Sequence, residues 1–459
     1  MSLLDATDAR PVHFVGIAGA GMSALAELFI RRGVPITGCD ANPASAEDLR
    51  RLGVMVTGHD PAHVESVRAL VVTSAMPKDH PELVRARELG VPVIRRAEAL
   101  GEVTANRELV GIAGTHGKTT TTVMTATALA AAGRDPTALV GGRVGAWEGN
   151  LRAGGDTLYV VEADEYDRSF LALTPTVAVV TNIEADHLDI YNDLADIKRA
   201  FAQFSRGSRT IVLCGDDSGA SSLPTPGTAE VIRYGITSPD ARMLATDVQS
   251  GSGGSRFEVL FDDERLGAVE LSVPGRHNVL NALAAISAGV ALGANFHRLA
   301  EGLKSVAGAE RRFQRLGETR GIAVVDDYAH HPTEIAATLA AARSAFPGRR
   351  IVAAFQPHLY SRTRDFAQEF GKALSAADSV FLTEIYAARE QPIRGVTTSL
   401  VADALTAAGG TLAWRGDRSK LADALASRVH EGDVVLTVGA GDITRTGPEL
   451  LHRLGASDR

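Results

Sequence analysis

Short apolar runs alternate with longer segments of helical period along most of this chain, and glycines mark many of the junctions. In "PVHFVGIAGAGMSALAELFIRRG", an apolar run from Val12 to Val15 meets a glycine-rich turn and then a helix-period stretch that ends at Gly33. This order predicts a strand, a tight turn and a helix. The alternation continues through "ALVVTSAMP" and "VPVIRRAEALG" to about Val103. It predicts a Rossmann-like parallel sheet over residues 1–103.

The first glycine turn also has the features of a dinucleotide-binding turn. Read from Gly19, "GAGMSA" fits the pattern G-x-G-x-x-A, and Asp40 follows at the end of the next apolar run. In that pattern the glycines let the backbone approach a pyrophosphate, and an acidic residue about twenty positions later contacts a ribose. A glycine cluster in any α/β unit is the alternative interpretation.

A second strand, turn and helix begins in "ELVGIAGTHGKTTTTVMTATALAAAG". Leu109 to Ala113 is the expected strand, and Thr119 to Ala132 is the expected helix. The loop between them departs from the Walker A pattern G-x-x-x-x-G-K-[ST], because Ile112 stands where the first glycine belongs. The strand and helix on either side nevertheless favour a phosphate-binding loop.

The chemistry of this second loop suits a nucleoside triphosphate. Its backbone N–H groups can turn inward on an anion, and the N-terminus of the following helix adds partial positive charge. Lys118 can reach the outer phosphates, and Thr119 can place its hydroxyl on Mg²⁺. The alternative is a lysine that simply begins an ordinary helix.

Acidic residues follow two later apolar runs, "LYVVEADEYDRSFL" and "TVAVVTNIEADHLDIY". Because the carboxyl ends of parallel strands meet at one edge of a sheet, we expect these residues to converge near the phosphate loop. Some of them should cap helices instead, since six ligands exceed what one cation needs. The chemistry of Mg²⁺, which prefers oxygen, favours a hydrogen-bonding histidine within this set. The set comprises Glu162, Asp164, Glu165, Glu184, Asp186 and His187.

A third segment repeats the alternation in "GIAVVDDYAHHPTEIAATLAAAR", "RRIVAAFQPHLYSRTRDFAQEF", "SVFLTEIYAARE" and "DVVLTVGAGDITR". Pro332 is suited to the first turn of a helix. His330 and His331 could bind a metal, but a loop that contacts substrate is the favoured interpretation because no third ligand stands at a usual spacing. The Gly/Ser-rich stretch "QSGSGGSRFEVLFDDERLGAVELSVPG" predicts an edge ribbon or a linker before this segment.

Length and composition predict a folded protein of several domains. A chain of 459 residues corresponds to roughly three domains, with expected boundaries at 1–103, 104–313 and 314–459. The net charge of -8 argues against broad binding to nucleic acid or to an acidic membrane surface. The least polar window, Val279 to Phe296, carries polar residues and predicts a buried helix rather than a membrane span.

The cysteines and the N-terminal residues indicate the cellular compartment in which the protein is expected. "MSLLDATDAR" lacks the basic end and apolar run of a signal peptide, so we expect no export. Cys39 and Cys214 can form neither a disulfide framework nor a CxxC metal site, which favours a reducing cytoplasm. The sequence predicts no chemistry at either cysteine.

Seven motifs in order identify a resemblance. They are "GTHGKTT", "EADEYDRSF", "TNIEADHLD", "GRHNVLN", "ERRF", "DDYAHHPTE" and "QPHLYSRT", and together they resemble the Mur ligases over nearly the whole chain. The early glycine and internal "GT" of the phosphate loop match this family's own pattern. The resemblance implies three α/β domains: a Rossmann-like UDP-binding domain, a central P-loop ATPase-like domain and a C-terminal Rossmann-like domain that binds an amino acid.

The resemblance also assigns roles to individual residues. Lys118, His187 and Arg312 are implied to be catalytic, and Thr119, Glu162 and His187 to bind metal. Tyr328, His330 and Arg362 are implied to form the amino-acid pocket. The implied UDP-substrate residues are Gly16, Ala18, Gly19, Gly21, Met22, Ser23, Asp40, Ser74 and His116. The implied ATP residues are Gly114, Thr115, Gly117, Lys118, Thr119, Thr120, His277, Asn278, Asn281, Arg312 and Asp326.

Two positions depart from the pattern of some relatives. Leu359 stands where some have a second arginine, so the contact to the carboxylate of the amino acid is in question. Several sister ligases support their metals with a carbamylated lysine, but Ala202 occupies the corresponding position here, and Lys198 is a different one. We expect no such modification.

The activity implied is ATP-dependent amide formation between the lactyl carboxylate of UDP-N-acetylmuramate and L-alanine through an acyl phosphate, in peptidoglycan precursor synthesis. The implied cofactors are ATP and Mg²⁺, with Mn²⁺ as a substitute, and the expected oligomeric state is a monomer or a homodimer. A recycling ligase that adds a tripeptide to the same nucleotide sugar is the nearest alternative. A nicotinamide-dependent oxidoreductase and a nonenzymatic nucleotide sensor are alternatives from other classes.

Overall fold

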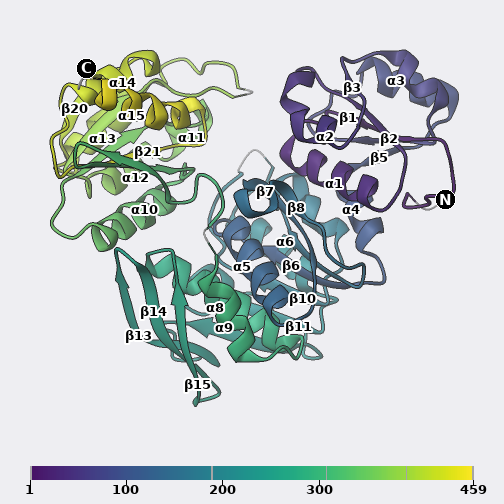
Figure 1. Ribbon diagram of the computed structural model, residues 1–459, viewed down its shortest axis with the longest axis horizontal. Coiled ribbons are helices and arrows are strands. Elements are labelled where there is room, and N and C mark those ends of the chain that lie inside the picture. The colour runs from purple at the N-terminus through teal and green to yellow at the C-terminus, as the bar shows by residue number, and fades with distance from the viewer. Residues whose placement is uncertain (1–2, 188–189, 307, 389, 457–459) are drawn as a thin grey trace. The chain divides into compact units, whose positions relative to one another are not determined.

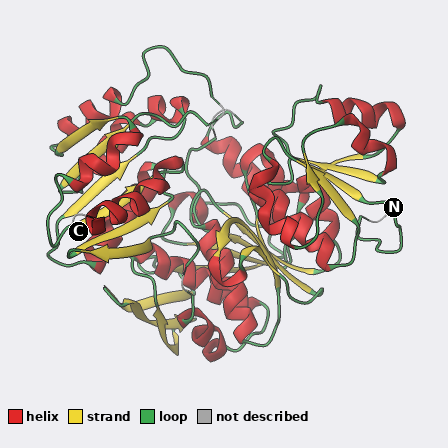
Figure 2. Ribbon diagram, turned by 45° about the horizontal axis from the view of Figure 1, so that its top comes forward, coloured by secondary structure: helices red, strands yellow, loops and turns green. Residues whose placement is uncertain are grey.

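The computed structural model describes residues 3–187, 190–306, 308–388 and 390–456. Its strands form three sheets, which follow one another along the chain (Figure 1). In Figure 2, helices border the sheets, as expected where short apolar strands alternate with amphipathic helices. Among the described residues, no helix combines the length and the apolar character that a membrane crossing requires.

The first sheet has five parallel strands in the order β3-β2-β1-β4-β5. The strand predicted at residues 12–15 is β1, and the helix predicted after the first glycine turn is α1, so both predictions are confirmed. The strands are β1 (Val12–Val15), β2 (Ile36–Cys39), β3 (Val56–Thr57), β4 (Ala69–Val72) and β5 (Val93–Arg95). The helices are α1 (Ala20–Arg31), η1 (Pro43–Ala46), α2 (Glu47–Arg51), η2 (Pro61–Ser66), α3 (Pro81–Leu89) and α4 (Arg96–Thr104).

The second sheet has ten strands in the order β15-β14-β13-β12-β11-β10-β6-β9-β7-β8. The Gly/Ser-rich stretch supplies strands at one edge of this sheet, as predicted. The strands are β6 (Glu108–Ala113), β7 (Thr137–Val144), β8 (Gly149–Arg152), β9 (Leu158–Glu162), β10 (Val177–Val180), β11 (Thr210–Cys214), β12 (Glu230–Gly235), β13 (Met243–Gly251), β14 (Gly254–Phe261) and β15 (Glu264–Leu271). The helices are α5 (Lys118–Ala131), η3 (Gly145–Trp147), η4 (Tyr166–Ala172), α6 (Leu194–Ser205), α7 (Ser218–Ser221), α8 (Arg276–Ala291) and α9 (Phe296–Lys304).

The third sheet has six strands in the order β16-β17-β21-β18-β19-β20, of which only β16 is antiparallel to its neighbour. Apolar side chains from both of its faces are buried beneath helices. The strands are β16 (Gln314–Thr319), β17 (Ile322–Asp327), β18 (Ile351–Phe355), β19 (Ser379–Thr383), β20 (Leu412–Gly416) and β21 (Val434–Val438). The helices are α10 (Pro332–Ala345), α11 (Tyr360–Asp365), α12 (Ala367–Leu374), α13 (Ser399–Ala407), η5 (Arg418–Lys420), α14 (Leu421–Ala426), η6 (Asp442–Arg445) and α15 (Thr446–Ala456).

By packing, the chain forms two compact units. Unit 1 comprises residues 1–246, 258–269 and 280–306, and unit 2 comprises residues 247–257, 270–279 and 307–459. Residues 279–291 of the apolar window predicted as a buried helix lie in α8, whose residues 281–289 are buried, but the helix ends at Ala291 and the window's last residue, Phe296, begins α9. We keep 1–103, 104–313 and 314–459 as proposed domain boundaries, which the succession of three sheets supports.

Candidate active site

The phosphate loop joins the end of β6 to the start of α5. Gly114 has φ +145°, and a Cβ there would lie 1.9 Å from Thr181 Oγ1, so only glycine fits. The N–H groups of Thr115 and His116 donate to the backbone oxygen and Oδ1 of Asn182 at 3.1 and 2.8 Å. Because β10 lies beside β6, the residues that follow β10 hold the loop in place.

Lys118 begins α5 and forms a buried ion pair. Its Nζ donates to the Gly114 carbonyl at 2.6 Å and lies 2.8 Å from the Glu165 carboxylate. Burial opposes the lysine charge, but Glu165 and Asp164 outweigh it and raise the pKa of Lys118. Burial raises the pKa of Glu165 to about 7, against the opposing effect of Lys118. Lys118 is therefore charged, and it is held at the loop by the carboxyl of Glu165, whose pKa is raised.

Thr119 and Glu162 present oxygen ligands beside that lysine. Thr119 Oγ1 donates to both carboxylate oxygens of Glu162 at 3.0 Å, and the Gly141 N–H donates to Glu162 Oε2 at 2.7 Å. Glu162 is the last residue of β9, which pairs with β6 on the side opposite β10. The strand-end carboxylate thus reaches the phosphate loop, as the parallel topology predicted.

His187 and its acidic neighbours complete this edge of the sheet. His187 Nε2 lies 3.7 Å from Glu165 Oε1 and 3.8 Å from Asp186 Oδ2. His116 Nε2 lies 3.4 Å from Glu184 Oε2. The structure therefore brings most of the predicted acidic set to the loop. Both interpretations of His187, as hydrogen-bonding histidine and as metal ligand, are compatible with these contacts.

The segment after Glu165 has an unusual backbone. Asp167 and Arg168 have φ values of 53° and 55°, and His187 also has a φ of 53°. Arg168 is anchored by Asp196 at 2.7 Å and lies over the ring of Tyr191. Non-glycine residues in the left-handed region cost free energy and cluster at functional sites, so this strain supports the assignment of an active site here.

Other predicted nucleotide residues of unit 1 also lie at the loop. Thr120 is buried in the first turn of α5. Asn281, on α8, accepts a hydrogen bond from Thr121 Oγ1 at 3.1 Å and lies against Gly117. Asn281 therefore packs on the phosphate loop itself, which makes it a positioning residue for the loop.

The first glycine turn is shaped by backbone contacts. Gly16 has φ +79°, and its N–H donates to the Cys39 carbonyl at 2.8 Å. Asp40 Oδ2 accepts from the Ala18 N–H at 3.0 Å. Within the first turn of α1, the Ser23 hydroxyl donates to the Ala20 carbonyl at 2.9 Å. The predicted carboxylate thus fixes the turn.

A cavity of about 300 Å³ within unit 1 lies beside this turn. Gly19, Gly21 and the backbone around Met22 line one side, and Glu162 lines another. Arg96 of α4 also lines it, and a Cβ at Gly21 would lie 2.9 Å from Arg96 Nη1. Ser74 is exposed in the loop that follows β4. Arg96 could not be predicted here, because nothing in the motif spacing relates α4 to the glycine turn.

In unit 2, a group of buried and half-buried ionisable residues surrounds Arg312. Arg312 Nη1 lies 3.7 Å from Glu334 Oε1, and its guanidinium lies over the Tyr328 ring. Burial, assisted by Arg312, lowers the pKa of His277 to about 4. Burial raises the pKa of Asp327 to about 6, against the opposing effect of Arg312. His277 is therefore neutral at pH 7.

Asp326 is buried in a network within unit 2. Its carboxylate accepts from Arg311, Thr437 and Thr444 at 3.1, 2.6 and 2.8 Å. The ribose contact assigned to Asp326 stays a prediction. Asn278 Nδ2 donates to the Pro274 carbonyl at 2.8 Å, so this side chain also contacts the backbone just before α8.

The predicted amino-acid residues gather at the ends of β17 and β18. His330 Nδ1 lies 3.1 Å from the Tyr328 carbonyl, and the His330 ring lies 5.8 Å from that of His358. Arg362 is 6 % exposed, and its Nη1 lies 3.4 Å from His358 Nδ1. Burial excludes the alternative that Arg362 is a solvated surface residue. No role was predicted for His358, although it belongs to the motif "QPHLYSRT".

Comparison with family models divides the chain as the sheets do. Residues 11–108 match the model described as Mur ligase family, catalytic domain, and residues 112–289 match the Mur ligase middle domain. Residues 311–441 match the model described as Mur ligase, glutamate ligase domain. The chain belongs to the Mur ligase family. The resemblance inferred from the seven motifs is therefore confirmed.

Full-length relatives of this Mur ligase are closely similar. UDP-N-acetylmuramate–L-alanine ligase of Acidothermus cellulolyticus is 47% identical over 451 residues, which cover 96% of this chain and 94% of that protein. The structure of a UDP-N-acetylmuramate–alanine ligase from Thermotoga maritima aligns with a TM-score of 0.83 at 31% identity, covering 97% of this chain and 99% of that one. A murein peptide ligase from Psychrobacter arcticus aligns with a TM-score of 0.71 at 25% identity, covering 97% and 99%. The predicted three-domain α/β fold is thus confirmed.

Proposed function

We propose that this Mur ligase joins L-alanine to UDP-N-acetylmuramate with consumption of ATP, as a step in peptidoglycan precursor synthesis in the cytoplasm. The observation that carries the proposal is the phosphate loop, where Lys118 and Thr119 lie within hydrogen-bonding distance of Glu165 and Glu162. The similarity to alanine ligases over 96% of the chain supports the choice of substrates. ATP use fits a glycine-containing loop at the N-terminus of α5 that carries a charged lysine.

A carboxylate is a poor acyl donor, so it must be activated before it can form an amide. In the proposed reaction, a lactyl carboxylate oxygen attacks the γ-phosphorus of ATP, the bond to the β-phosphate oxygen breaks, and an acyl phosphate and ADP form. The neutral amine of alanine then attacks the carbonyl carbon, inorganic phosphate leaves with the bonding electrons, and the amine loses a proton. Lys118 Nζ would stabilise the charge that develops on the transferred phosphoryl oxygens.

We propose that Thr119 and Glu162 hold Mg²⁺, or Mn²⁺ in its place, and that His187 is a further ligand. The hydroxyl and carboxylate oxygens, 3.0 Å apart, are the hard ligands that these cations prefer. The cation would offset negative charge on the phosphates. Thr119 and Glu162 already orient one another, so the oxygen ligands are held in place by the fold.

Residues of unit 2 complete the proposed sites. We assign His277, Asn278, Arg312 and Asp326 to ATP, and the neutral, half-buried His277 is suited to a face of the uncharged base. We assign Tyr328, His330 and Arg362 to L-alanine, because the buried guanidinium of Arg362, beside His358, suits a small carboxylate. The first glycine turn, with Asp40 and the neighbouring cavity, is assigned to the UDP substrate.

The decisive experiment measures phosphate release by the full-length protein with ATP, UDP-N-acetylmuramate and L-alanine, each omitted in turn. Release that requires all three, with a product heavier than the nucleotide sugar by one alanyl residue, supports the proposal. Turnover with a tripeptide in place of L-alanine would identify the recycling ligase instead. Release without either acceptor, or binding of NAD(H) without binding of UDP, would contradict the proposal.

A further inference from the structure

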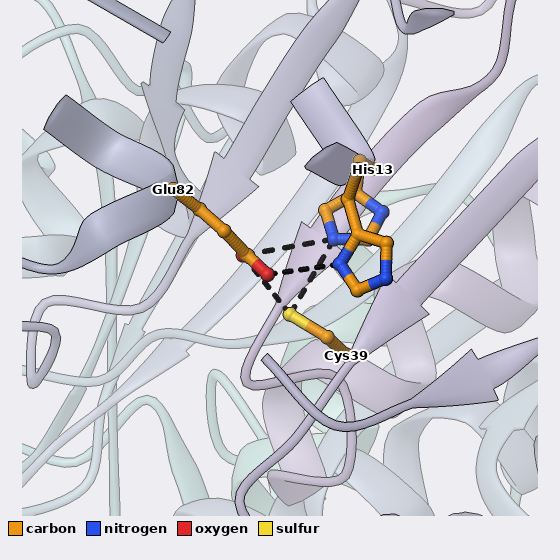
Figure 3. Close-up of side chains that lie close together, drawn as sticks. His13, Cys39 and Glu82 are labelled. Carbon is orange, nitrogen blue, oxygen red and sulfur yellow. Dashed lines mark hydrogen bonds and ion pairs between the residues drawn. The ribbon is translucent and has the colours of Figure 1, made fainter. Parts of the chain in front are cut away.

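Four chemically reactive side chains meet inside the first sheet domain, away from the phosphate loop. They are His13 of β1, Cys39 at the end of β2, His63 of η2 and Glu82 of α3. His13, Cys39 and Glu82 are at most 1 % exposed, and Figure 3 shows their side chains pointing toward one another. One nitrogen, sulfur or oxygen atom from each of the four lies within 4.8 Å of the others.

The distances within this cluster approach those between the ligands of one metal ion. His13 Nε2 lies 3.4 Å from Cys39 Sγ and 3.7 Å from Glu82 Oε2. Cys39 Sγ lies 3.1 Å from Glu82 Oε2, and His63 Nδ1 lies 2.9 Å from Glu82 Oε1. Zinc bonds of about 2.0–2.3 Å in a tetrahedral site put the ligand atoms about 3.3–3.8 Å apart. Small outward shifts of the sulfur and carboxylate would therefore open the cluster to a zinc ion.

The remaining atoms of the ligands are already oriented by neighbours. His13 Nδ1 lies 2.8 Å from Thr37 Oγ1, and His63 Nε2 lies 3.1 Å from Thr57 Oγ1. With the ring protons on these outer nitrogens, Nε2 of His13 and Nδ1 of His63 present lone pairs to the cluster. The Asp60 N–H donates to Glu82 Oε1 at 2.8 Å. Outer-shell hydrogen bonds of this kind orient the ligands of protein metal sites.

The donor set also selects the metal. Sulfur and imidazole nitrogen suit Zn²⁺, whereas Mg²⁺ and Ca²⁺ prefer oxygen. A thiolate and a carboxylate would neutralise the two positive charges of the ion, which removes the cost of burying it. Among the described residues, Glu82 makes its ion-pair contacts with these two histidines, so a metal would supply a fixed positive charge beside this buried carboxylate.

A redox role for Cys39 fits the structure less well. The thiol is fully buried, and burial, assisted by Glu82, raises its pKa. Oxidation of a cysteine needs an accessible thiolate, which this environment disfavours. His59 Nδ1 also lies 3.1 Å from Cys39 Sγ, but His59 is exposed, so His63 is the better fourth ligand.

We propose that His13, Cys39, His63 and Glu82 bind one structural Zn²⁺ ion. The site joins four segments that are separate in sequence, so the ion would stabilise this domain. The Cys39 carbonyl also accepts from the N–H groups of Gly16 and Ile17, so the same residue ties the metal site to the first glycine turn. The proposal stands whether or not the chain is an alanine ligase.

The test uses the reduced, full-length protein after removal of metals with a chelator. Co²⁺ is added as a spectroscopic substitute for zinc, because only a cysteine ligand gives a thiolate-to-cobalt charge-transfer band in the near ultraviolet. We expect such a band in the wild type, its displacement by one equivalent of Zn²⁺, and its loss in Cys39→Ser. Cys214→Ser is the matched control, because Cys214 is the second buried cysteine and lies on β11 of another sheet.

A second variant keeps all four ligands and so does not depend on the fold of Cys39→Ser. Thr37→Val removes the partner of His13 Nδ1, and zinc affinity, measured by competition with a chromophoric chelator, should fall about tenfold or more. Zinc should also raise the melting temperature of the wild type, since it binds only the folded protein. Absence of the band in the wild type, or a band that survives Cys39→Ser and disappears in Cys214→Ser, would overturn the proposal.

Discussion

The two glycine turns of unit 1 share a strand, a turn and a helix, but they differ in the charges around them. The second turn contains its own cation, Lys118, paired with Glu165. The cation beside the first turn, Arg96, comes from a different helix, and the carboxylate of Asp40 is engaged with the backbone of the turn. Glycine spacing therefore determines how closely a ligand can approach the backbone. Side chains from neighbouring elements determine which ligand that is.

The largest expected effect is at the second turn. Lys118→Ala should lower turnover at least a hundredfold, because a fixed charge at developing oxyanions contributes on the order of 3 kcal/mol. The KM for UDP-N-acetylmuramate should change little, since the first turn is intact. Steady-state kinetics checks both values, with Lys198→Ala as a control, because Lys198 contacts Ser222 on the surface. Near-normal turnover of a folded Lys118→Ala protein would refute the role.

Arg362 lies outside both turns, so a variant at this residue should change neither the KM for ATP nor the KM for UDP-N-acetylmuramate. Arg362→Ala should raise the KM for L-alanine roughly ten- to a hundredfold, because a charge-assisted pair contributes about 1.5–3 kcal/mol. Arg362→Lys should recover only part, since it loses the planar fork. Leu359→Ala is the control, because leucine cannot hydrogen-bond a carboxylate. A larger effect from the leucine change would show that another group holds the carboxylate.

The next prediction concerns the proposed metal ligand Glu162, which lies at the second turn. Glu162→Ala should raise the Mg²⁺ concentration needed for half-maximal activity at least about tenfold, because one of the hard oxygen ligands is removed. Titration of activity with Mg²⁺ at saturating substrates measures this requirement. An unchanged titration curve would remove Glu162 from the metal site.

At the first turn, Asp40→Ala should act on one substrate alone. Loss of the bonds that its carboxylate accepts from the N–H groups of Ala18 and Asn42 should raise the KM for UDP-N-acetylmuramate about tenfold. The KM for ATP serves as the internal control and should not change. An equal rise in both KM values would show that Asp40 supports the whole unit rather than the first turn.

The smallest effect concerns Glu165, whose pKa is raised from 4.5 to about 7. A carboxyl with a raised folded-state pKa contributes stability that is present below about 4.5 and lost as pH rises through about 7. Glu165→Gln lacks this pH dependence. The melting temperature of the variant minus that of the wild type should therefore be higher by a few degrees at pH 8 than at pH 5. Thermal unfolding at both pH values is the measurement. A constant difference would contradict the raised pKa.

Local sequence patterns were enough to predict the strands and helices that carry the turns. Val12–Val15, the phosphate loop and the helix at Pro332 are all defined by residues close together in the chain. The strand-end carboxylates could also be predicted, because parallel topology brings carboxyl ends to one edge. Glu165 was expected among these carboxylates. The sequence did not indicate which of them would pair with Lys118.

Contacts between distant elements were not predictable where they depend on how individual helices and loops pack rather than on strand order. Arg96 lies beside the first turn only because of the way α4 packs, and His358 reaches Arg362 only because of the bend before α11. The cluster around Cys39 gathers residues from positions 13 to 82, with no motif spacing that relates them. For this reason the sequence predicted no chemistry at that cysteine.

The crowding at Gly114 has a consequence for inhibitor resistance. Alanine there would need both a disfavoured φ and displacement of Thr181, so substitutions at this position would damage the phosphate loop. An inhibitor that depends on the N–H groups of this loop contacts atoms that every residue type except proline has. Resistance by a change in those contacts would then have to come from residues that surround the loop, and these also hold the loop in shape.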